Sequence, residues 1–358
     1  MAEFHLRRQV LQNPTSGTVG AGNTKVVYRI PRQSNRRLEK IEIHANITLG
    51  AGISAGTASN RLEGFLREVR FNASDIGASG RDVFKAPSAT LMAWHLKHAR
   101  QTCRYNNTAY RAAAAATYDI MVPLHFSNPA APSPQRLFTS MPMWAKDATG
   151  TGLGADPELE IDFAALNDTE LGLTGGTITY NRFRVVLFFR DIGPGAIPYV
   201  PFVLETTQFE TGSSGGANIR FTYPKDGWLC STMLENFSTP ATGVRGSVLT
   251  AATDRWLWRY KGTDFDETYP ELMVHEDDLD TIQGTTAATN NVPDTIYTRN
   301  FWHDAPHAEA RRLNNVPNLY EQNGGDLLTL EGTSVGANRR IVATNYKLLI
   351  GDPTVMAE

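Results

Sequence analysis

Three stretches of the sequence combine residue types that proteins use for catalysis or metal binding. The first, Gly332-Thr-Ser334-Val-Gly336, matches the pattern G-x-S-x-G. In a nucleophile elbow this pattern follows a strand and opens a helix, which leaves the serine strained and exposed. Here the sequence continues with Ala337-Asn-Arg-Arg into another strand pattern. Without a following helix the elbow is incomplete, so we predict a hairpin loop and no hydrolase serine.

The second stretch places His303, Asp304 and His307 within five residues, and zinc binds such side chains when a further ligand is supplied. Pro306 prevents the regular helix that would align the two imidazoles at positions i and i+4. No further ligand at a matching spacing is evident. A surface turn is therefore the interpretation that we favour, with a metal site as the alternative.

The third feature is a pair of acidic clusters, one at Asp264, Asp266 and Glu267 and the other spanning Glu276 to Asp280. Grouped carboxylates could hold calcium, especially across a subunit boundary. The EF-hand spacing, with its central glycine and terminal glutamate, is absent. We therefore expect solvated acidic surface, keep structural calcium as the alternative, and leave the metal site unassigned.

Other chemical motifs are absent from the sequence. It has no P-loop, no G-x-G-x-x-G between a strand and a helix, no H-E-x-x-H and no C-x-x-C. Trp256 and Trp258 share one strand face, and we expect that face in the core, because a sugar-stacking platform would need both rings exposed. We therefore predict a protein with no catalytic residues and no cofactor, and not an enzyme.

Composition limits the architecture and the partners. With 358 residues the chain exceeds the usual size of one domain, and a hydrophobic content of 41% can supply two cores. The formal net charge of −3 gives no electrostatic argument for nucleic-acid binding. Cys103 and Cys230 fall in different halves, which fits reduced thiols in a cytosol. The first twelve residues lack the apolar core of a signal peptide, and no apolar window is long enough to span a membrane.

The elements that position these residues follow the same order twice, as strands, a helix and further strands. Apolar residues at every second position, as in Ile41, Ile43 and Ala45, predict half-buried strands. In the first half we predict strands at Leu38–Leu49, Arg61–Phe71, Tyr118–Phe126, Leu137–Met143, Glu158–Ala164 and Thr177–Phe189, with a helix at Pro87–Gln101. In the second half we predict strands at Ile219–Tyr223, Ser247–Tyr260, Ile296–His303, Asp326–Leu330 and Ile341–Ile350, with a helix at Tyr269–Ile282.

Gly- and Pro-rich segments divide the chain. Residues 1–22 are polar and end in a Gly/Ser/Thr-rich stretch, which predicts an N-terminal arm outside the core. The segment Asp191–Pro198 joins the halves. We therefore predict a first jelly roll over 23–193 and a second over 194–358. The expected fold class is all-β, with two tandem eight-stranded antiparallel jelly rolls that each carry a short helix.

This order of elements resembles the double jelly-roll major capsid proteins of tailless icosahedral viruses, particularly bacterial viruses that contain a membrane. The resemblance covers residues 24 to 352 and is carried by architecture alone, because this family has no short diagnostic motif. No functional residue can therefore be transferred to a position of this chain.

The resemblance implies homotrimers that form pseudo-hexagonal capsomers of an icosahedral shell. The implied partners are other copies of the chain, capsid proteins such as a vertex protein, and an internal lipid membrane that Arg7 and Arg8 of the arm could touch. It implies no direct sequence-specific contact with nucleic acid. The implied location is the virion, after synthesis in the host cytoplasm.

Two other classes remain open at this stage. The first is a carbohydrate-binding or polysaccharide-active two-domain β-sandwich protein, in which exposed tryptophans and two close carboxylates would be expected. The second is a bicupin enzyme, which would need His and Glu ligands clustered on strands. His44 and His125 are each alone on their predicted strands, and we expect His95 and His98 at the edge of the first helix.

Overall fold

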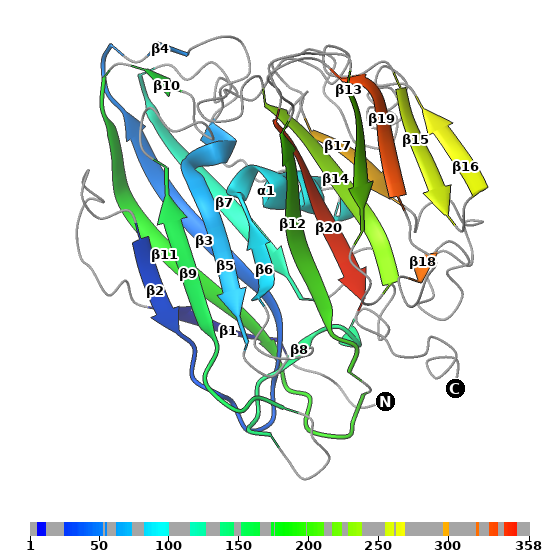
Figure 1. The fold of residues 1–358 in the computed structure, drawn as a ribbon. Helices are drawn as coiled ribbons and strands as arrows, with labels where there is room; N and C mark the ends of the chain where they lie inside the picture. The colour runs from blue at the N-terminus through cyan, green and yellow to red at the C-terminus, as the bar shows by residue number, and fades with distance from the viewer. Residues whose placement is uncertain are drawn as a thin grey trace.

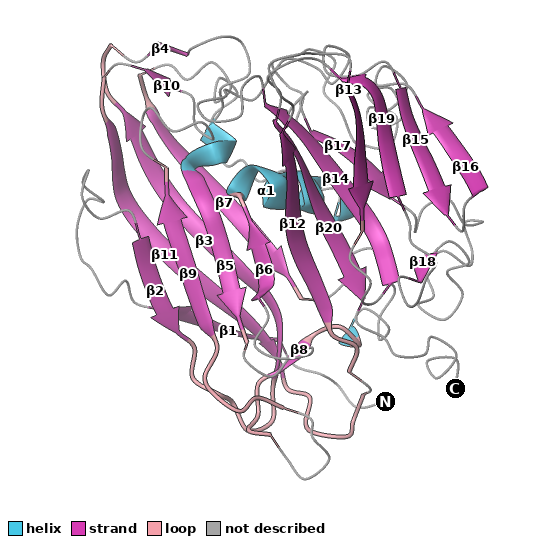
Figure 2. Cartoon of the chain, viewed as in Figure 1, coloured by secondary structure: helices cyan, strands magenta, loops and turns pink. Residues whose placement is uncertain are grey.

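The computed structural model describes residues 6–11, 25–52, 54–55, 62–73, 82–99, 115–126, 137–146, 152–164, 173–174, 176–197, 199–210, 217–223, 228–237, 255–260, 263–268, 296–300, 320–321, 329–335 and 340–348. Strands dominate these residues, and they run side by side in two groups (Figures 1 and 2). No helix among them is both long and apolar enough to cross a membrane.

Two facing sheets form the first group of strands (Figure 1). One sheet has the order β1 (Leu6–Leu11), β11 (Ile178–Arg190), β3 (Arg37–Leu49) and β7 (Thr117–His125), and the short β8 (Met141–Pro142) also pairs with β3. The other layer has the order β6 (Asp82–Ala86), β5 (Leu66–Asn72), β9 (Glu158–Phe163) and β2 (Lys25–Arg29). All neighbours within these two layers are antiparallel.

The second group is built in the same way. One layer has the order β12 (Phe202–Glu210), β20 (Arg340–Leu348), β14 (Trp228–Phe237) and β17 (Ile296–Asn300), with β18 (Tyr320–Glu321) also pairing with β14. The other has the order β13 (Ala217–Thr222), β19 (Thr329–Val335), β15 (Arg255–Tyr260) and β16 (Thr263–Thr268). These neighbours are again antiparallel.

The two groups repeat each other strand by strand. The order β1-β11-β3-β7 corresponds to β12-β20-β14-β17, and β2-β9-β5-β6 corresponds to β13-β19-β15-β16, both in space and along the chain. Successive strands cross between the two layers in the same sequence, except at the hairpins β5–β6 and β15–β16. The predicted fold class is therefore confirmed: the chain forms two tandem eight-stranded jelly rolls.

The two jelly rolls are joined by one strand contact and by a helix. β6 and β12 pair in parallel through Phe84 and Leu204, so that two layers form one continuous sheet. The helix α1 (Ser88–Ala99) follows β6 and lies between the two halves (Figure 1). It confirms the helix predicted at Pro87–Gln101, whereas the helix predicted at Tyr269–Ile282 lies outside the described residues.

Short elements complete the first jelly roll. A 3-10 helix, η1 (Leu62–Phe65), precedes β5, and the two-residue strands β4 (Ser54–Ala55) and β10 (Leu173–Thr174) pair near one end of the sandwich. The predicted strand at Arg61–Phe71 thus begins as a helical turn. The predicted strand at Leu137–Met143 is wrong for its first residues, because Ser140 donates its backbone and hydroxyl hydrogens to the carbonyl of Leu137 and closes a turn.

The core follows the alternation that the sequence contains. On β3 the side chains of Ile41, Ile43 and Ile47 are fully buried, and those of Glu42, His44 and Asn46 are half-buried on the outer face. Burial of these branched apolar side chains is the main stabilising contribution of each sheet, at about 25 cal/mol per Å². The same cluster continues across the join to Met233 and Tyr346 of the second jelly roll.

The N-terminal residues are a correction to the predicted arm. Residues 6–11 form β1, which pairs with six residues of β11 at the edge of the first sheet. Leu11 packs against the core, although Leu6 and Val10 are exposed. The sequence LRRQVL hides this strand, because its two arginines interrupt the apolar alternation.

Candidate functional site

The serine of the G-x-S-x-G pattern lies in a strand. β19 extends through Ser334 to Val335, and the next described element along the chain is another strand, β20, which begins at Arg340. The glycine before it, Gly332, pairs with Ile219 on one side and Trp256 on the other. The predicted loop is therefore wrong at Ser334, which belongs to a strand with neighbours on both sides, but the geometry of a nucleophile elbow is equally absent.

The acidic cluster on β16 is engaged in ion pairs. Asp264 accepts a hydrogen bond from Arg259 at 2.5 Å, and Glu267 accepts one from Arg255 at 3.1 Å. The bond from Arg259 holds the pKa of Asp264 below its ordinary value. Within the part of the chain that the structure describes, no three His, Cys, Asp or Glu side chains are grouped as metal ligands. The second cluster, Glu276 to Asp280, lies outside those residues, as do His303, Asp304 and His307.

A buried histidine pair is a feature that the sequence did not reveal. His95 of α1 and His125 of β7 stack with ring centroids 4.8 Å apart, and Nδ1 of His95 lies 2.6 Å from Nε2 of His125. The expectation that His95 lies at a helix edge is wrong, since only 2% of the residue is exposed. Burial lowers the pKa of His95 to about 4, which keeps the imidazole neutral at neutral pH. This arrangement is a packing contact beneath the helix.

The two tryptophans of β15 lie in the core. Trp256 and Trp258 are fully buried, and Trp258 stacks on Tyr223 with centroids 6.0 Å apart. The prediction of a core face is confirmed, and these rings offer no platform for a sugar. The other strand histidine considered for a bicupin site, His44, bonds Glu42 at 3.0 Å.

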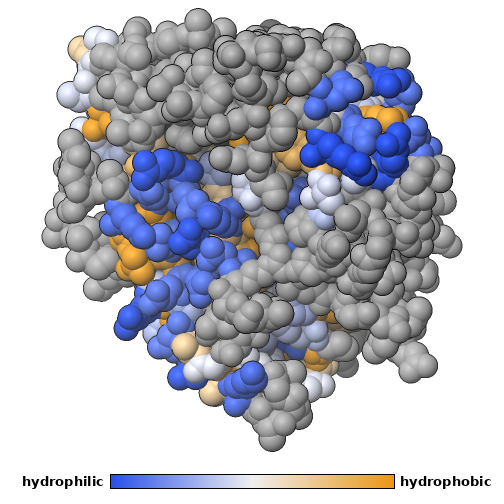
Figure 3. Space-filling view, in the orientation of Figure 1, coloured by the Kyte–Doolittle hydropathy of each residue, from blue (hydrophilic) through white to orange (hydrophobic). Residues whose placement is uncertain are grey.

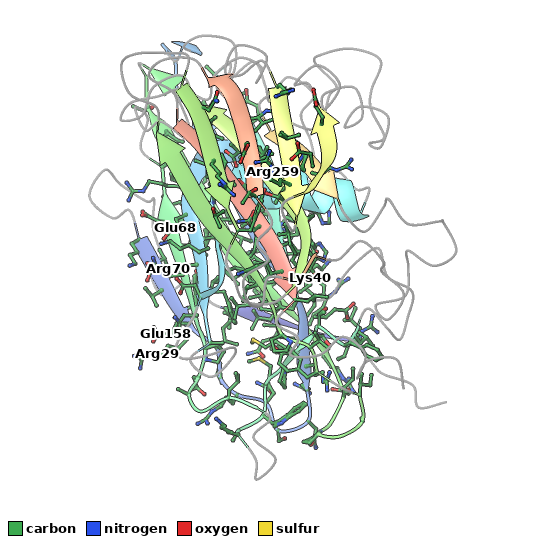
Figure 4. The ribbon with its side chains drawn as sticks, turned by 45° about the vertical axis from the view of Figure 1, so that its right-hand side comes forward. Arg29, Lys40, Glu68, Arg70, Glu158 and Arg259 are labelled. Carbon is green, nitrogen blue, oxygen red and sulfur yellow. The ribbon has the colours of Figure 1, made fainter. Side chains whose placement is uncertain are left out.

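Charged side chains cover the outer face of the layer β2-β9-β5-β6. Acidic residues of the central strand β9 pair with bases on both neighbours: Glu158 with Arg29 at 2.9 Å, and Asp162 with Arg67. Figure 4 shows Arg29, Glu158, Glu68 and Arg70 along one margin of the first jelly roll, and Lys40 away from them on the opposing sheet. Figure 3 shows this surface as a hydrophilic patch.

The equivalent face of the second jelly roll repeats this charge pattern. On the central strand β19, Glu331 pairs with Arg220 of β13 at 3.4 Å and with Arg259 of β15 at 3.1 Å. A second hydrophilic patch covers β15 and β16 (Figure 3). Both faces therefore carry acids on the central strand between bases on its two neighbours, which are favourable cross-strand pairs.

The described residues line a hollow on the outer face of β1-β11-β3-β7. It has a volume of about 470 Å³, and its walls are formed by residues of four strands: Val10, His44, Ala45, Asn46, Asp119, Ile120, Arg182, Arg184 and Val186. Asn46 donates to Asp119 at 2.6 Å across β3 and β7. Burial opposes ionisation of the neighbouring Glu42, but hydrogen bonds from His44 and Lys40 outweigh it and lower the pKa of this carboxyl.

The equivalent outer face of the second jelly roll is covered by the first. Tyr346 of β20 packs edge-on against Trp94 of α1 with centroids 5.4 Å apart. Thr90 donates to the buried carboxylate of Glu235, and the hydroxyl of Thr206 donates to the carbonyl of Lys85 at 2.8 Å. These contacts between the first and second sandwiches are packing and hydrogen-bond contacts.

Comparisons with solved structures identify this architecture. The chain matches the crystal structure of the STIV major capsid protein with a TM-score of 0.62 at 9% identity, over 97% of both chains. It matches the major capsid protein P2 from bacteriophage PM2 with a TM-score of 0.54 at 13% identity, over 97% of this chain and 99% of that one. The quasi-atomic model of the PBCV-1 virus capsid gives 0.56 at 12% identity, over 97% and 94%.

These proteins share the double jelly roll and come from different icosahedral viruses, so the likeness does not single out bacterial viruses. At such identities the likeness establishes the fold and transfers no residue role. No protein-family model matches the sequence, and no curated protein matches it.

Proposed function

We propose that the chain is the major capsid protein of an icosahedral virus and has a structural role without catalysis. The observation that carries this proposal is the match over nearly the whole length to major capsid proteins, with both jelly rolls included. The buried tryptophans of β15 and the ion-paired carboxylates of β16 argue against a carbohydrate site at these positions.

We propose further that three copies form a pseudo-hexagonal capsomer. Two similar sandwiches in each chain supply six similar units per trimer, and closed rotational symmetry is the usual way in which identical subunits satisfy their contacts. Other copies of the capsomer and a vertex protein would then be its partners, and the virion its location. The domain limits 23–193 and 194–358 remain predictions, with β1 added to the first sandwich.

The narrower prediction of a membrane-containing bacterial virus gains no support from the N-terminal residues. Arg7 bonds Asp191 at 3.0 Å, and the guanidinium of Arg8 lies 5.2 Å from the ring centroid of Phe188. Both arginines therefore have contacts within the sheet, and a lipid contact remains a prediction. Synthesis in the host cytoplasm is a prediction of the same kind.

The mass of the purified protein in solution tests the proposal. We expect light scattering to give three times the chain mass of 39.4 kDa, and electron microscopy at high concentration to show hexagonal blocks or shells. Adding a chelator tests the structural calcium that the acidic clusters suggested, because loss of the trimer would reveal a metal between subunits. A monomer that forms no particles under any assembly condition would contradict the proposed function.

A further inference from the structure

We propose that His95 and His125 form an acid-sensitive latch, which holds the two jelly rolls together while His95 is neutral and releases α1 when His95 takes up a proton. The latch consists of contacts within one chain, so it does not depend on the proposed capsomer.

The histidine pair lies where α1 is seated on the first jelly roll. The two imidazoles stack with 10° between their planes, and Nδ1 of His95 lies 2.6 Å from Nε2 of His125. The exposed fractions of the two residues are 2% and 6%. A positive charge on either ring would therefore be almost cut off from water while the helix is in place.

The hydrogen bond between the rings leaves no favourable place for a second proton on His95. The bond uses one proton, which sits on one of the two facing nitrogens. If Nδ1 of His95 is the donor, a second proton goes to Nε2, which is buried and has no hydrogen-bond partner among the described residues. If Nδ1 is the acceptor, a second proton goes to Nδ1 itself and the bond is lost. Protonation of His95 in its seat is therefore costly in either tautomer.

The surroundings of His95 set the pH range of the latch. Burial lowers the pKa of His95 to about 4, the positive charge of Lys40 contributes to this, and Glu42 opposes it. Lys40 lies opposite His125 in the register of β3 and β7. An imidazole released into water returns to its ordinary pKa of 6.5, so the open form binds the proton more strongly. The share of open molecules therefore grows as the pH falls from 6.5 toward 4.

Other charged and titratable groups lie on the elements around α1, which are η1, β5, β7 and β17 in the first contacts and β14 and β20 across the join. The described side chains of this kind, besides His125, are Arg67, Glu68, Arg70, Asp119, Glu235, Arg299, Tyr346 and Lys347. Those of β5 belong to ion pairs that include Arg67 with Asp162 and Arg70 with Asp82. The charges that shift the pKa of His95 are those of Lys40 and Glu42.

Release of α1 would loosen the join because the neighbouring Trp94 spans it. The ring centroid of Trp94 lies 5.6 Å from that of His125 and 5.4 Å from that of Tyr346 in the second jelly roll. One turn earlier in the helix, Thr90 donates to the buried carboxylate of Glu235. A helix of twelve residues is marginal in water once it leaves its seat, so the same event exposes the amides of α1.

Hydrogen exchange of α1 at two pH values tests the latch. With the two pKa values above, the open share should be about twentyfold larger at pH 5 than at pH 7, and the protection of α1 should fall by this factor after correction for the chemical exchange rate. Carboxyl groups with an ordinary pKa of about 4 stay mostly ionised at pH 5. Low concentrations of urea should hardly change the protection of α1, because its release exposes little surface, whereas the protection of β9 should fall with urea.

A matched pair of substitutions assigns the response to the latch. His95→Gln keeps hydrogen-bonding groups but does not titrate, and it should remove most of the acid response of α1. His44→Gln is the control, because His44 lies on the same sheet face with 35% of its side chain exposed and bonds Glu42 at 3.0 Å. H44Q should keep the response of the wild type.

A cysteine at position 344 reports the join itself. Thr344 is fully buried, and its hydroxyl lies 3.3 Å from that of Thr206, which also contacts the first jelly roll. In a chain whose Cys103 and Cys230 are replaced by alanine, the thiol of T344C should react with a pyridyl disulfide about twentyfold faster at pH 5 than at pH 7, relative to a free thiol. Val185→Cys, which is fully buried in the core of the first jelly roll, should react more slowly than T344C at both pH values.

Three results would overturn the inference. The first is an acid response that H95Q keeps in full or that H44Q loses to the same extent. The second is a loss of α1 protection that depends on urea as strongly as that of β9, since acid would then act on unfolding of the whole first jelly roll. The third is an acid response of α1 without one in T344C, which would mean that the pair seats the helix but does not hold the two halves together.

Discussion

Replacing Trp94 by alanine should uncouple the two jelly rolls. Trp94 lies on α1 between the halves, with 3% of the residue exposed, and its ring contacts His125 of the first half and Tyr346 of the second. The strand contact of the join contains a single residue pair, Phe84 with Leu204. Most of the adhesion between the halves must therefore come from side chains around the helix.

The size of the effect follows from the buried area. A tryptophan buries about 150–250 Å², which at about 25 cal/mol per Å² corresponds to roughly 4–6 kcal/mol. Alanine keeps a small part of this, and the large-to-small substitutions measured in protein cores cost about 3–5 kcal/mol. The edge-on contact with Tyr346 accounts for about 1 kcal/mol of the loss.

Trp144→Ala is the matched control, because Trp144 is equally buried at 4% but contacts Arg37 at the end of the first jelly roll. Unfolding of a two-domain chain need not be two-state, so native-state hydrogen exchange is the appropriate assay. We expect W94A to lower protection of β14 and β20 more than that of β3 and β11, and W144A to lower protection of β3 and β11 without this bias. Equal loss across both halves in W94A would refute the reasoning.

Two further predictions concern the first jelly roll. Phe183→Asp should prevent folding and yield insoluble protein. The ring of Phe183 lies in the core against Phe163, with centroids 5.1 Å apart, and a charge buried there would have no partner. The control, Phe183→Leu, should remain folded by circular dichroism. Since burial lowers the pKa of His95 to about 4, below its ordinary value of 6.5, the unfolded chain binds a proton between these values that the folded chain does not. The contribution of neutral His95 to the free energy of unfolding should therefore be fully present above pH 6.5 and fall by up to about 3 kcal/mol as the pH drops to 4. Urea unfolding midpoints measured across this pH range would show the loss. His95→Phe should flatten the pH dependence of the midpoint, and an unchanged pH dependence in this variant would disprove the assignment to His95.

Strands rich in apolar side chains were predictable from the sequence. β3, β7, β9, β11 and β20 were located within two residues, because β3 and β9 alternate buried with half-buried residues and the other three contain runs of apolar and β-branched side chains. The internal repeat of the closing strands was also correct: β11 and β20 begin at Ile178 and Arg340 and occupy equivalent places in the two sandwiches. Order and period were thus enough to give the fold class.

Strands with polar residues on their inner positions were missed. β12 (FVLETTQFE) and β14 (WLCSTMLENF) carry polar side chains on the face that meets the first jelly roll: Glu235 is fully buried there and accepts from Thr90, and Thr206 is half-buried and donates to the carbonyl of Lys85. β1 carries two arginines that are held by Asp191 and Phe188, both far away in the sequence. Likewise, no local pattern could bring His95 to His125, because the contact depends on how α1 sits on β7.

The division of polar residues between the faces indicates which sides of the sandwich meet another sandwich. On the outer faces of β2-β9-β5-β6 and β13-β19-β15-β16, charges pair across strands while staying partly solvated, as in Arg29 with Glu158 at 80% and 44% side-chain exposure. Exposed pairs of this kind contribute little to stability, about 0–1 kcal/mol, but a face covered by full charges is costly to dehydrate. On β12-β20-β14, by contrast, the outer side chains are mostly neutral, such as Ser231, Thr344 and Tyr346, and they are buried. The open face of β1-β11-β3-β7 is intermediate: amide and apolar groups lie there beside the charged Asp119, Arg182 and Arg184, so a second copy that covered this face would have to supply partners for these charges.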